Sequence, residues 1–377
     1  MTTPAPPLAV FVAETRTGRV LTTSLPYSSV PTAGFRINAE GPLSFSVPMS
    51  ATFGKREILD YLYPWKYSFG VRIGSFIIQY GPLTVNPEYD PVAEEWTFDC
   101  TGMWGFFNRK RILRTSRYYT GASRFDVFRR LLADDLAQTN GDLPIDLPAN
   151  DNLLGPGAEF PAGKLSPIGE LIRDQTDVGD VSLEAEFRPY FPDELSMSHV
   201  RHRLDLAPYL GRQGFVHRWT SKGSLVMAVP IGGGERIADV YLVPGQSNGD
   251  NALVGQYDVS ASFVDGLQNQ NWPLMMDLDT THTASGDADE LNSFAEGNYS
   301  AFHRGARAVK ARVRINPPQG QGPRIVDWKL GDYGAFTVTG LLGIPNGTYV
   351  CRIIGATLAT LEDIDLDLVL VSEVMDS

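Results

Sequence analysis

Hydrophobic and polar residues alternate along most of this chain, a pattern typical of β-strands that bury one face. Residues 8–47 hold two such runs separated by a Thr-Gly pair, which predicts a hairpin. Alternation returns over residues 66–83, over most of residues 181–265, and in four or five segments between residues 308 and 371. The sequence therefore predicts a mainly β fold of the β-rich α+β class.

Helical periodicity is confined to a few segments. The clearest is SRFDVFRRLLADDLAQTNG, in which Ser123 is the expected N-cap, the apolar residues share one face, and Asn140 with Gly141 ends the helix. Shorter helices are predicted at four other places: residues 55–62, residues 104–107, a segment with Ser166 as cap and Pro167 at its first position, and residues 287–306.

The order of these elements divides the chain into four parts. Two β-rich regions, residues 1–118 and 176–285, flank a helical and loop segment at residues 119–175. A helix followed by a small β module occupies residues 286–377. Residues 142–164 are polar and rich in proline and glycine, so we expect a long loop and a domain boundary there.

Composition limits the classes of function. The 377 residues are 43% hydrophobic, enough for a proper core, and their net charge of −12 repels phosphate backbones, so we expect no tight binding of DNA or RNA. The two cysteines lie far apart in apolar runs, which predicts no disulfide. No stretch reaches the roughly 18 apolar residues that a membrane-spanning helix needs. We therefore expect no membrane anchor.

One motif suggests catalysis. Gly245, Ser247 and Gly249 match G-x-S-x-G, the signature of a serine-hydrolase nucleophile elbow. Four later residues could complete a triad: Asp277, Asp279, His282 and His303. An elbow needs a helix directly after the serine, but the residues after Gly249 alternate as in a strand. We therefore favour a solvent-exposed β-turn at Ser247, with a serine hydrolase as the alternative.

Two further groups of residues look like metal ligands. His199 and His202 have a spacing that permits a metal pair on a helix, but no cysteine or carboxylate completes a site, so we expect surface residues. Asp363, Asp365 and Asp367 begin like a calcium loop and lack its glycine. Their alternation with aliphatic residues predicts a strand with one acidic, wet face. We expect neither a metal nor a cofactor.

Aromatic residues are concentrated in two places. Tyr61, Tyr63, Trp65 and Tyr67 recur at every second position, and Trp104 lies in the predicted helix that follows residue 102. Rings at this spacing could stack on sugars as a carbohydrate-binding strip. The simpler interpretation buries one half in a core and presents the other at a protein interface, and we assign these five residues to an interface.

Three stretches follow one another in a characteristic order. The first joins GRVLTTSLPYSSV to YGPLTVNPEYDPVAEEWTFDCTGMWGFFNRKRIL, the second is DVYLVPGQSNGDN, and the third joins FHRGARAVKARVRI to GTYVCRIIGATLATLEDIDLDLVLV. In this order they resemble the baseplate hub proteins, or minor tail proteins, of long-tailed phages that infect actinobacteria. The likeness covers most of the chain and lies in the order of the pieces. Residues 142–164 and 187–218 have no clear counterpart.

This resemblance implies a homotrimer at the tail tip of a virion, made in the host cytoplasm. Residues 1–118 and 176–285 would be tube-like β-barrel or sandwich domains that form a pseudo-sixfold ring continuing the tail tube, and residues 286–377 would end in a small β-barrel. The distal tail protein, the tape measure protein and other minor tail or fibre proteins would be its partners.

The net charge gains a meaning in such a ring. Three copies carry 3 × (−12) = −36, and an acidic lumen would let genome DNA slide through without binding. We therefore expect a structural protein that is not an enzyme. The alternatives are a hexameric distal tail protein, a serine hydrolase or cell-wall-degrading enzyme, and a carbohydrate-binding module.

Overall fold

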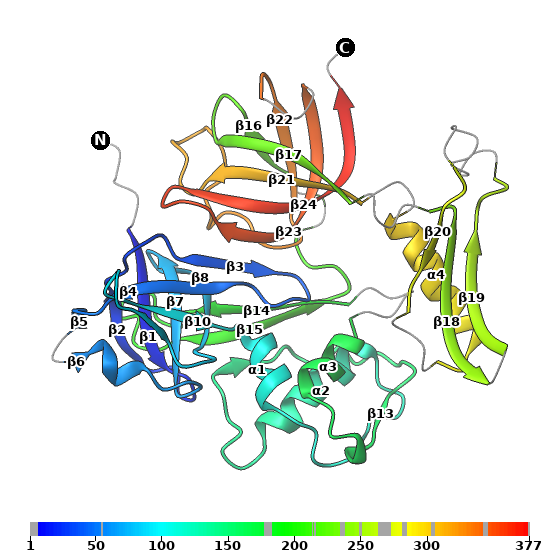
Figure 1. Cartoon of the computed structure of the whole chain (residues 1–377), viewed down its shortest axis with the longest axis horizontal. Coiled ribbons are helices and arrows are strands. Elements are labelled where there is room, and N and C mark those ends of the chain that lie inside the picture. The colour runs from blue at the N-terminus through cyan, green and yellow to red at the C-terminus, as the bar shows by residue number, and fades with distance from the viewer. Residues whose placement is uncertain are drawn as a thin grey trace.

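The computed structural model describes residues 7–53, 56–176, 183–212, 214, 216–233, 238–248, 251–262, 273–280, 285–302, 306–341 and 346–375. Within these ranges the chain forms six β-sheets and four α-helices, which confirms the β-rich α+β class. None of the helices described is long and apolar enough to cross a membrane. Figure 1 shows the N-terminal sheets at the left, a C-terminal sheet above them, helices below, and a separate strand and helix unit at the right.

The N-terminal part contains two antiparallel sheets with a shared core. The first has the order β2-β1-β7-β8 and consists of β1 (Leu8–Glu14), β2 (Val20–Leu25), β7 (Tyr67–Ile73) and β8 (Phe76–Pro82). The second contains β3 (Thr32–Arg36), β4 (Leu43–Pro48), β10 (Glu95–Cys100) and β9 (Glu88–Asp90). Phe45, Phe69 and Phe98 pack between them, with ring centroids 4.9 to 5.3 Å apart. The hairpin predicted at the start of the chain is β1 with β2.

The helix predicted over residues 55–62 is wrong. The chain instead forms a two-stranded hairpin of β5 (Thr52–Phe53) and β6 (Arg56–Glu57), followed by the 3₁₀ helix η1 (Ile58–Tyr61). The pairing of β6 with β5 takes up the first residues of the predicted helix, and Pro64 ends the segment, so only one short turn fits between them.

Three helices share a second core below the N-terminal sheets. They are α1 (Met103–Lys110), α2 (Arg124–Leu136) and α3 (Ile168–Asp174). In α2 the predicted cap is confirmed, because Ser123 Oγ accepts a hydrogen bond from the Asp126 N–H at 3.1 Å. The cap residue of α3 is Pro167, one residue later than predicted. Trp104 and Phe128 meet edge to face in this core at 5.9 Å.

Short strands complete this part of the chain. β11 (Arg117–Tyr118) pairs with β13 (Glu159–Phe160), and the 3₁₀ helix η2 (Ala162–Lys164) follows. A three-stranded sheet has the order β12-β15-β14 and consists of β12 (Ile145–Asp146), β14 (Glu184–Tyr190) and β15 (Arg201–Ala207). The predicted loop at residues 142–164 therefore contains two strands of two residues each.

Six strands of the C-terminal part surround Trp219, whose side chain is fully buried. Their order is β16-β22-β23-β24-β21-β17, with these bounds: β16 (Val216–Thr220), β17 (Leu225–Gly233), β21 (Ala306–Arg314), β22 (Tyr333–Val338), β23 (Gly347–Leu358) and β24 (Asp363–Met375). Trp219 stacks on Phe336 with centroids 4.8 Å apart and planes at 3°. The small C-terminal β-barrel remains a prediction for these strands.

A strand and helix unit is inserted between β17 and β21. It contains β18 (Val240–Asn248), β19 (Asn251–Asp258), β20 (Met276–Leu278) and α4 (Ala288–Phe302). α4 covers the β18–β19 hairpin through Leu291 and Ala295, which are fully buried against Tyr241 and Val243. At the start of α4, Asp287 Oδ1 accepts hydrogen bonds from the Asp289 and Glu290 N–H groups at 2.9 and 3.4 Å, and the Glu290 carboxylate accepts one from Ser285 Oγ. The division of the chain at residues 118, 175 and 285 stays a prediction.

Candidate functional site

The structure gives Ser247 a place in a strand. It lies in β18 opposite Ala252 of β19, so a second strand follows it where a nucleophile elbow needs a helix. Gly245 is the motif glycine that lies within the described residues, and close packing against α4 explains why this position has no side chain. A Cβ on Gly245 would lie 2.5 Å from Leu291 of α4, and a Cβ on Gly255 would lie 2.2 Å from the Leu291 backbone. The prediction that no helix follows is confirmed, and the predicted β-turn is corrected to a strand position.

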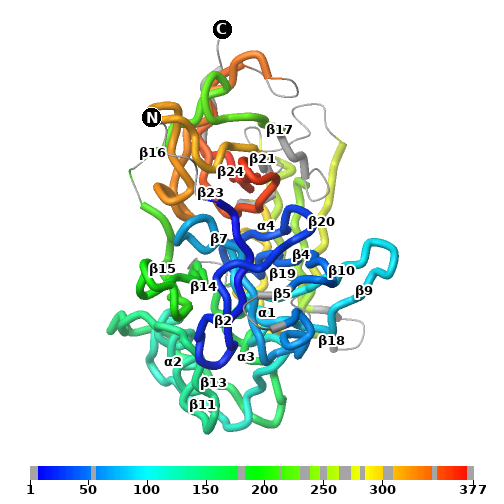
Figure 2. Tube along the Cα trace, turned by 90° about the vertical axis from the view of Figure 1, so that its left-hand side faces the viewer, coloured from blue at the N-terminus to red at the C-terminus, as the bar shows by residue number. Residues whose placement is uncertain are grey.

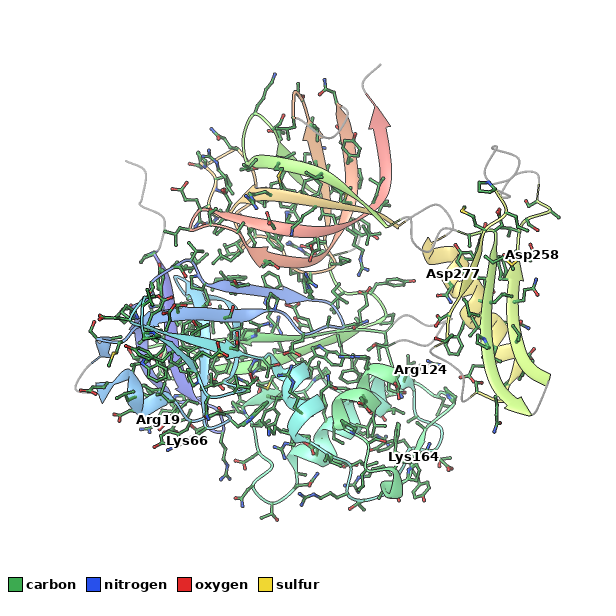
Figure 3. All side chains as sticks on the ribbon, in the orientation of Figure 1. Arg19, Lys66, Arg124, Lys164, Asp258 and Asp277 are labelled. Carbon is green, nitrogen blue, oxygen red and sulfur yellow. The ribbon has the colours of Figure 1, made fainter. Side chains whose placement is uncertain are left out.

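The other triad candidates do not form a catalytic group in the described part of the chain. Asp277 lies in β20, on the same separate unit, as Figure 3 shows. Asp279 Oδ2 accepts a hydrogen bond from Asn298 of α4 at 3.0 Å. His282 and His303 lie outside the described residues.

The two histidines considered as metal ligands lie in different environments. His199 is exposed as predicted, but His202 in β15 is 1% exposed, so its prediction as a surface residue is wrong. His202 stacks on Tyr80 at 5.2 Å, and burial lowers its pKa to about 4. Among the described residues, no group of three or more His, Cys, Asp or Glu could hold a metal ion.

The acidic strand near the C-terminus agrees with its prediction. In β24 the half-buried Asp363, Asp365 and Asp367 alternate with fully buried aliphatic residues. Arg312 donates to Asp365 at 2.7 Å, and Arg36 lies 3.0 Å from Asp367. Asp365 and Asp367 therefore pair with arginines of neighbouring strands, and Asp363 accepts a hydrogen bond from Thr360 Oγ1 at 3.3 Å.

The predicted interface residues divide between core and surface. Tyr61, Tyr67 and Trp104 are 1%, 7% and 3% exposed in the chain's own core. Tyr63 is 60% exposed, and Trp65 is half-buried beneath the Lys110 ammonium, which lies 4.5 Å from its ring centroid. The interface role of all five stays a prediction, and Tyr63 presents the most surface for it.

A junction that the sequence did not predict joins the N-terminal and C-terminal sheets. We call it the polar junction, because the buried Glu184, Glu186 and Asp332, described below, lie beside it. Residues 34–36 of β3 pair with residues 355–357 of β23, so the two sheets become one continuous ten-stranded sheet. Beside this seam, Phe35 stacks on Trp328 at 6.0 Å. Backbone pairing together with ring stacking fixes the two parts in one orientation.

A buried ion pair crosses the same junction. Arg352 of β23 donates through both terminal nitrogens to Glu184 of β14, with Nη1 2.6 Å from Oε1. The two side chains are 14% and 11% exposed. Glu184 also accepts from the Leu210 N–H at 2.7 Å, and Arg352 donates to the Leu210 carbonyl at 3.1 Å. This bidentate geometry satisfies the two charges away from water.

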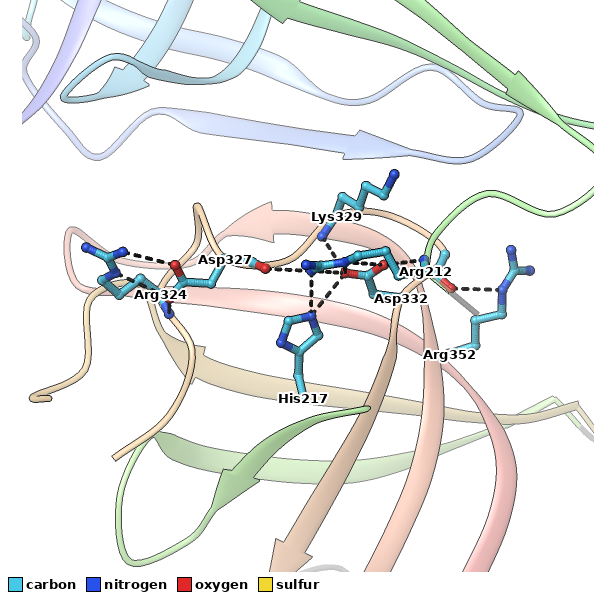
Figure 4. Close-up of polar contacts among 8 residues, drawn as sticks. Arg212, His217, Arg324, Asp327, Lys329, Asp332 and Arg352 are labelled. Carbon is cyan, nitrogen blue, oxygen red and sulfur yellow. Dashed lines mark hydrogen bonds and ion pairs between the residues drawn. The ribbon is translucent and has the colours of Figure 1, made fainter. Parts of the chain in front are cut away.

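A third polar group surrounds the fully buried Asp332, as Figure 4 shows. The Arg212 backbone N–H donates to Oδ1 at 2.7 Å, and its guanidinium donates to Oδ2 at 2.6 Å. His217 Nε2 lies 3.0 Å from Oδ2, and the Lys329 N–H donates to it at 3.2 Å. Burial alone would raise the pKa of the Asp332 carboxyl, but the hydrogen bonds from His217 and Arg212 outweigh it and hold the pKa well below its usual range.

Glu186 of β14 lies at the same junction and is 7% exposed. It lines two small clefts, one with Phe76 and Trp328 and the other with Glu40 and Trp104. Burial raises its pKa to about 7, against the lowering effect of Arg188. Burial also raises the pKa of Glu40.

The junction positions large parts of the chain rather than reacting groups. Glu184 and Asp332 are neutralised by Arg352 and Arg212, which lie far from them in sequence, whereas Glu186 forms no ion pair with any described residue. Glu184, Asp332 and Glu186 lie in segments whose sequence predicts an alternating strand or a turn. A single acidic residue in such a segment is predicted to be exposed to solvent. No signal in the sequence could have separated these buried carboxylates from their exposed neighbours.

Comparison with solved structures identifies the fold. The tail protein from Neisseria meningitidis MC58 matches with a TM-score of 0.56 and 12% identity, over 96% of each chain. The 43 kDa tail protein of prophage MuSo2 from Shewanella oneidensis gives 0.54 at 10% identity, over 96% of this chain and 98% of that one. The half-lidded Francisella PdpA-VgrG complex gives 0.55 at 10% identity, over 100% of this chain and 60% of that one. No protein-family model and no curated protein matches the sequence. This chain therefore has the fold of these tail proteins.

Proposed function

We propose that this chain is a structural protein of a phage tail tip, of the baseplate hub type. The observation that carries the proposal is the match along nearly the whole length of two tail proteins, each covered to 96% or more. A likeness of that extent includes the inserted unit and the junction as well as single sheets. The order of sequence motifs that resembles hub proteins of actinobacteriophages supports the same proposal independently.

The protein acts by assembly. Copies of the chain form a ring, a homotrimer, that continues the tail tube and binds the distal tail protein, the tape measure protein and fibre or other minor tail proteins. The buried polar junction supports this role, because a ring component needs its β parts fixed relative to one another. Genome DNA passes through the lumen, and the acidic residues that line the lumen repel the DNA phosphates. Replacing lumen acids with lysine should slow DNA ejection, and unchanged ejection would count against an acidic conduit.

Native mass spectrometry tests the stoichiometry. A trimer has a mass of 3 × 41.4 = 124 kDa and a hexamer, as expected of a distal tail protein, 6 × 41.4 = 248 kDa. The proposal predicts the trimer. A monomer at every concentration would contradict assembly itself.

The role is structural rather than enzymatic. The strand position of Ser247 supports this, since its neighbours leave no helix to aim an oxyanion amide. Purified protein and the Ser247→Ala variant should be equally inactive on chromogenic esters. Turnover that the substitution removes would establish a hydrolase in place of the proposed function.

A further inference from the structure

A β-hairpin of residues 88–95, here called the acidic hairpin, stands out from the body of the molecule. Figure 2 shows β9 on an arm that projects at the right of the view. Its eight residues, EYDPVAEE, include four acids and no lysine or arginine. Val92 at its turn is 92% exposed.

The acidic hairpin is ordered without contacting another part of the chain through its charges. Asp90 Oδ1 accepts from the Val92 and Ala93 N–H groups and fixes the turn, while Tyr89 packs on Trp96 at 5.0 Å. Among the strands that the structure describes, β9 pairs with β10 alone, so its outer edge has no partner there. No ion pair within the described residues involves Glu88, Asp90, Glu94 or Glu95.

A surface of opposite charge lies on the same chain. Residues 63–66 and 109–114, here called the basic aromatic patch, read YPWK and RKRILR and contain five cations and no acid. The Lys66 ammonium, labelled in Figure 3, lies 5.2 Å from the centroid of the Tyr63 ring. Lys110 covers Trp65, and Ile112 is 46% exposed. The contact between Lys110 and Trp65 therefore joins the two segments.

Two of the five cations of the basic aromatic patch form ion pairs within the chain. Arg111 lies 3.5 Å from Asp135, and Arg109 lies 3.9 Å from Glu40. Lys66, Lys110 and Arg114 are exposed and form no ion pair with any described residue. These three cations remain available to an acidic partner.

The backbone of the patch is strained. Trp65 has a φ of 66°, a left-handed conformation that is rare for a bulky side chain. A hydrogen bond from its N–H to the Leu83 carbonyl at 2.9 Å and packing on Phe106 at 6.0 Å hold it there. Strain of this kind is concentrated at functional sites, and here it turns the ring toward the surface that carries Lys110.

We propose that the acidic hairpin of one copy docks on the basic aromatic patch of the next copy in the ring. The inference rests on the proposed assembly of identical copies and names the surfaces that make it. Two different, complementary surfaces on one chain form a head-to-tail contact, and such a contact closes into a ring when the rotation between neighbouring copies is a whole fraction of a turn. The apolar turn at Val92 meets Tyr63 and Trp65, and the acids meet Lys66, Lys110 and Arg114.

Charge reversal and charge exchange test the pairing. The hairpin variant carries Glu88→Lys and Glu94→Lys, the patch variant carries Lys110→Glu and Arg114→Glu, and a third carries all four. All four side chains are exposed, and circular dichroism with thermal melts checks that each variant folds. Sedimentation velocity of the full chain at low and high salt measures assembly. Either two-site variant should raise the dissociation constant about tenfold or more, and the four-site variant should restore assembly.

A matched control separates local pairing from bulk charge. Glu159→Lys with Glu362→Lys changes the net charge by +4, as the hairpin variant does, at exposed positions outside both segments, and should assemble like the wild type. Two-site variants that assemble normally, or a four-site variant that stays dissociated, would overturn this inference while a wild-type ring upholds the proposed function. A patch variant that assembles normally but no longer retains a DNA duplex on a filter would assign the patch to DNA and overturn it too. A wild type that never associates would contradict both proposals.

Discussion

Replacing Glu186 with glutamine isolates the cost of a buried carboxylate at the junction. The side chain lies between the N-terminal sheets and the loop that carries Trp328, and burial raises its pKa from 4.5 to about 7. In the unfolded chain the carboxyl keeps its ordinary pKa. Since the folded pKa is the higher one, this group favours the folded state below about pH 4.5 and loses that contribution as the pH rises to about 7.

The size of the effect follows from the two pKa values. A difference of about 2.5 pH units at ~1.4 kcal/mol each gives roughly 3 kcal/mol of stability that the wild type loses between pH 4.5 and pH 8. Glutamine has nearly the same shape and does not ionise, so the Glu186→Gln variant should not show this loss.

Urea unfolding of both proteins at pH 4.5 and pH 8 measures the difference. The stability of Glu186→Gln relative to the wild type should increase by about 3 kcal/mol from the lower to the higher pH. The exposed Glu159→Gln serves as a control and should show no such change. A stability difference that is the same at both pH values would refute the assignment of Glu186 as a buried, destabilising charge.

Three further substitutions test the packing of the structure. Trp219→Ala removes the buried ring that stacks on Phe336 and should destabilise the chain by about 3–5 kcal/mol in urea melts; a loss below 1 kcal/mol would contradict that core. Arg352→Met leaves Glu184 buried without its cation and should cost about 3 kcal/mol, part of which Glu184→Gln should restore; no recovery in the double variant would argue against the pair. Ser123→Ala removes the cap of α2 and should cost about 1 kcal/mol by thermal melt, whereas an unchanged melt would show that the cap carries no stability.

Local pattern predicted the local elements well. The periodicity and caps of α2 and α4 identified both helices, and the alternation of acids with aliphatic residues identified β24 with its buried face. The failures have local causes as well. Over residues 55–62 a hairpin competes with the helix, and at His202 a strand turns the ring inward onto Tyr80 where spacing alone suggested a surface.

The sequence did not allow us to predict which strands pair when they lie far apart along the chain. β3 joins β23 across more than three hundred residues, and β16 pairs in parallel with β22, so nothing in either segment specifies its partner. The junction residues depend on the same arrangement. Arg352 and Glu184 are buried only because the sheets meet there, and their own neighbours in sequence resemble those of exposed charged residues.

The proposed function requires that copies of this chain form a ring. Cryo-electron microscopy of the purified protein and of the tail that contains it tests this most directly. We expect a threefold ring around an open lumen, with the hairpin of residues 88–95 bound to residues 63–66 and 109–114 of the neighbouring copy. A single, unassociated chain in both samples would contradict it.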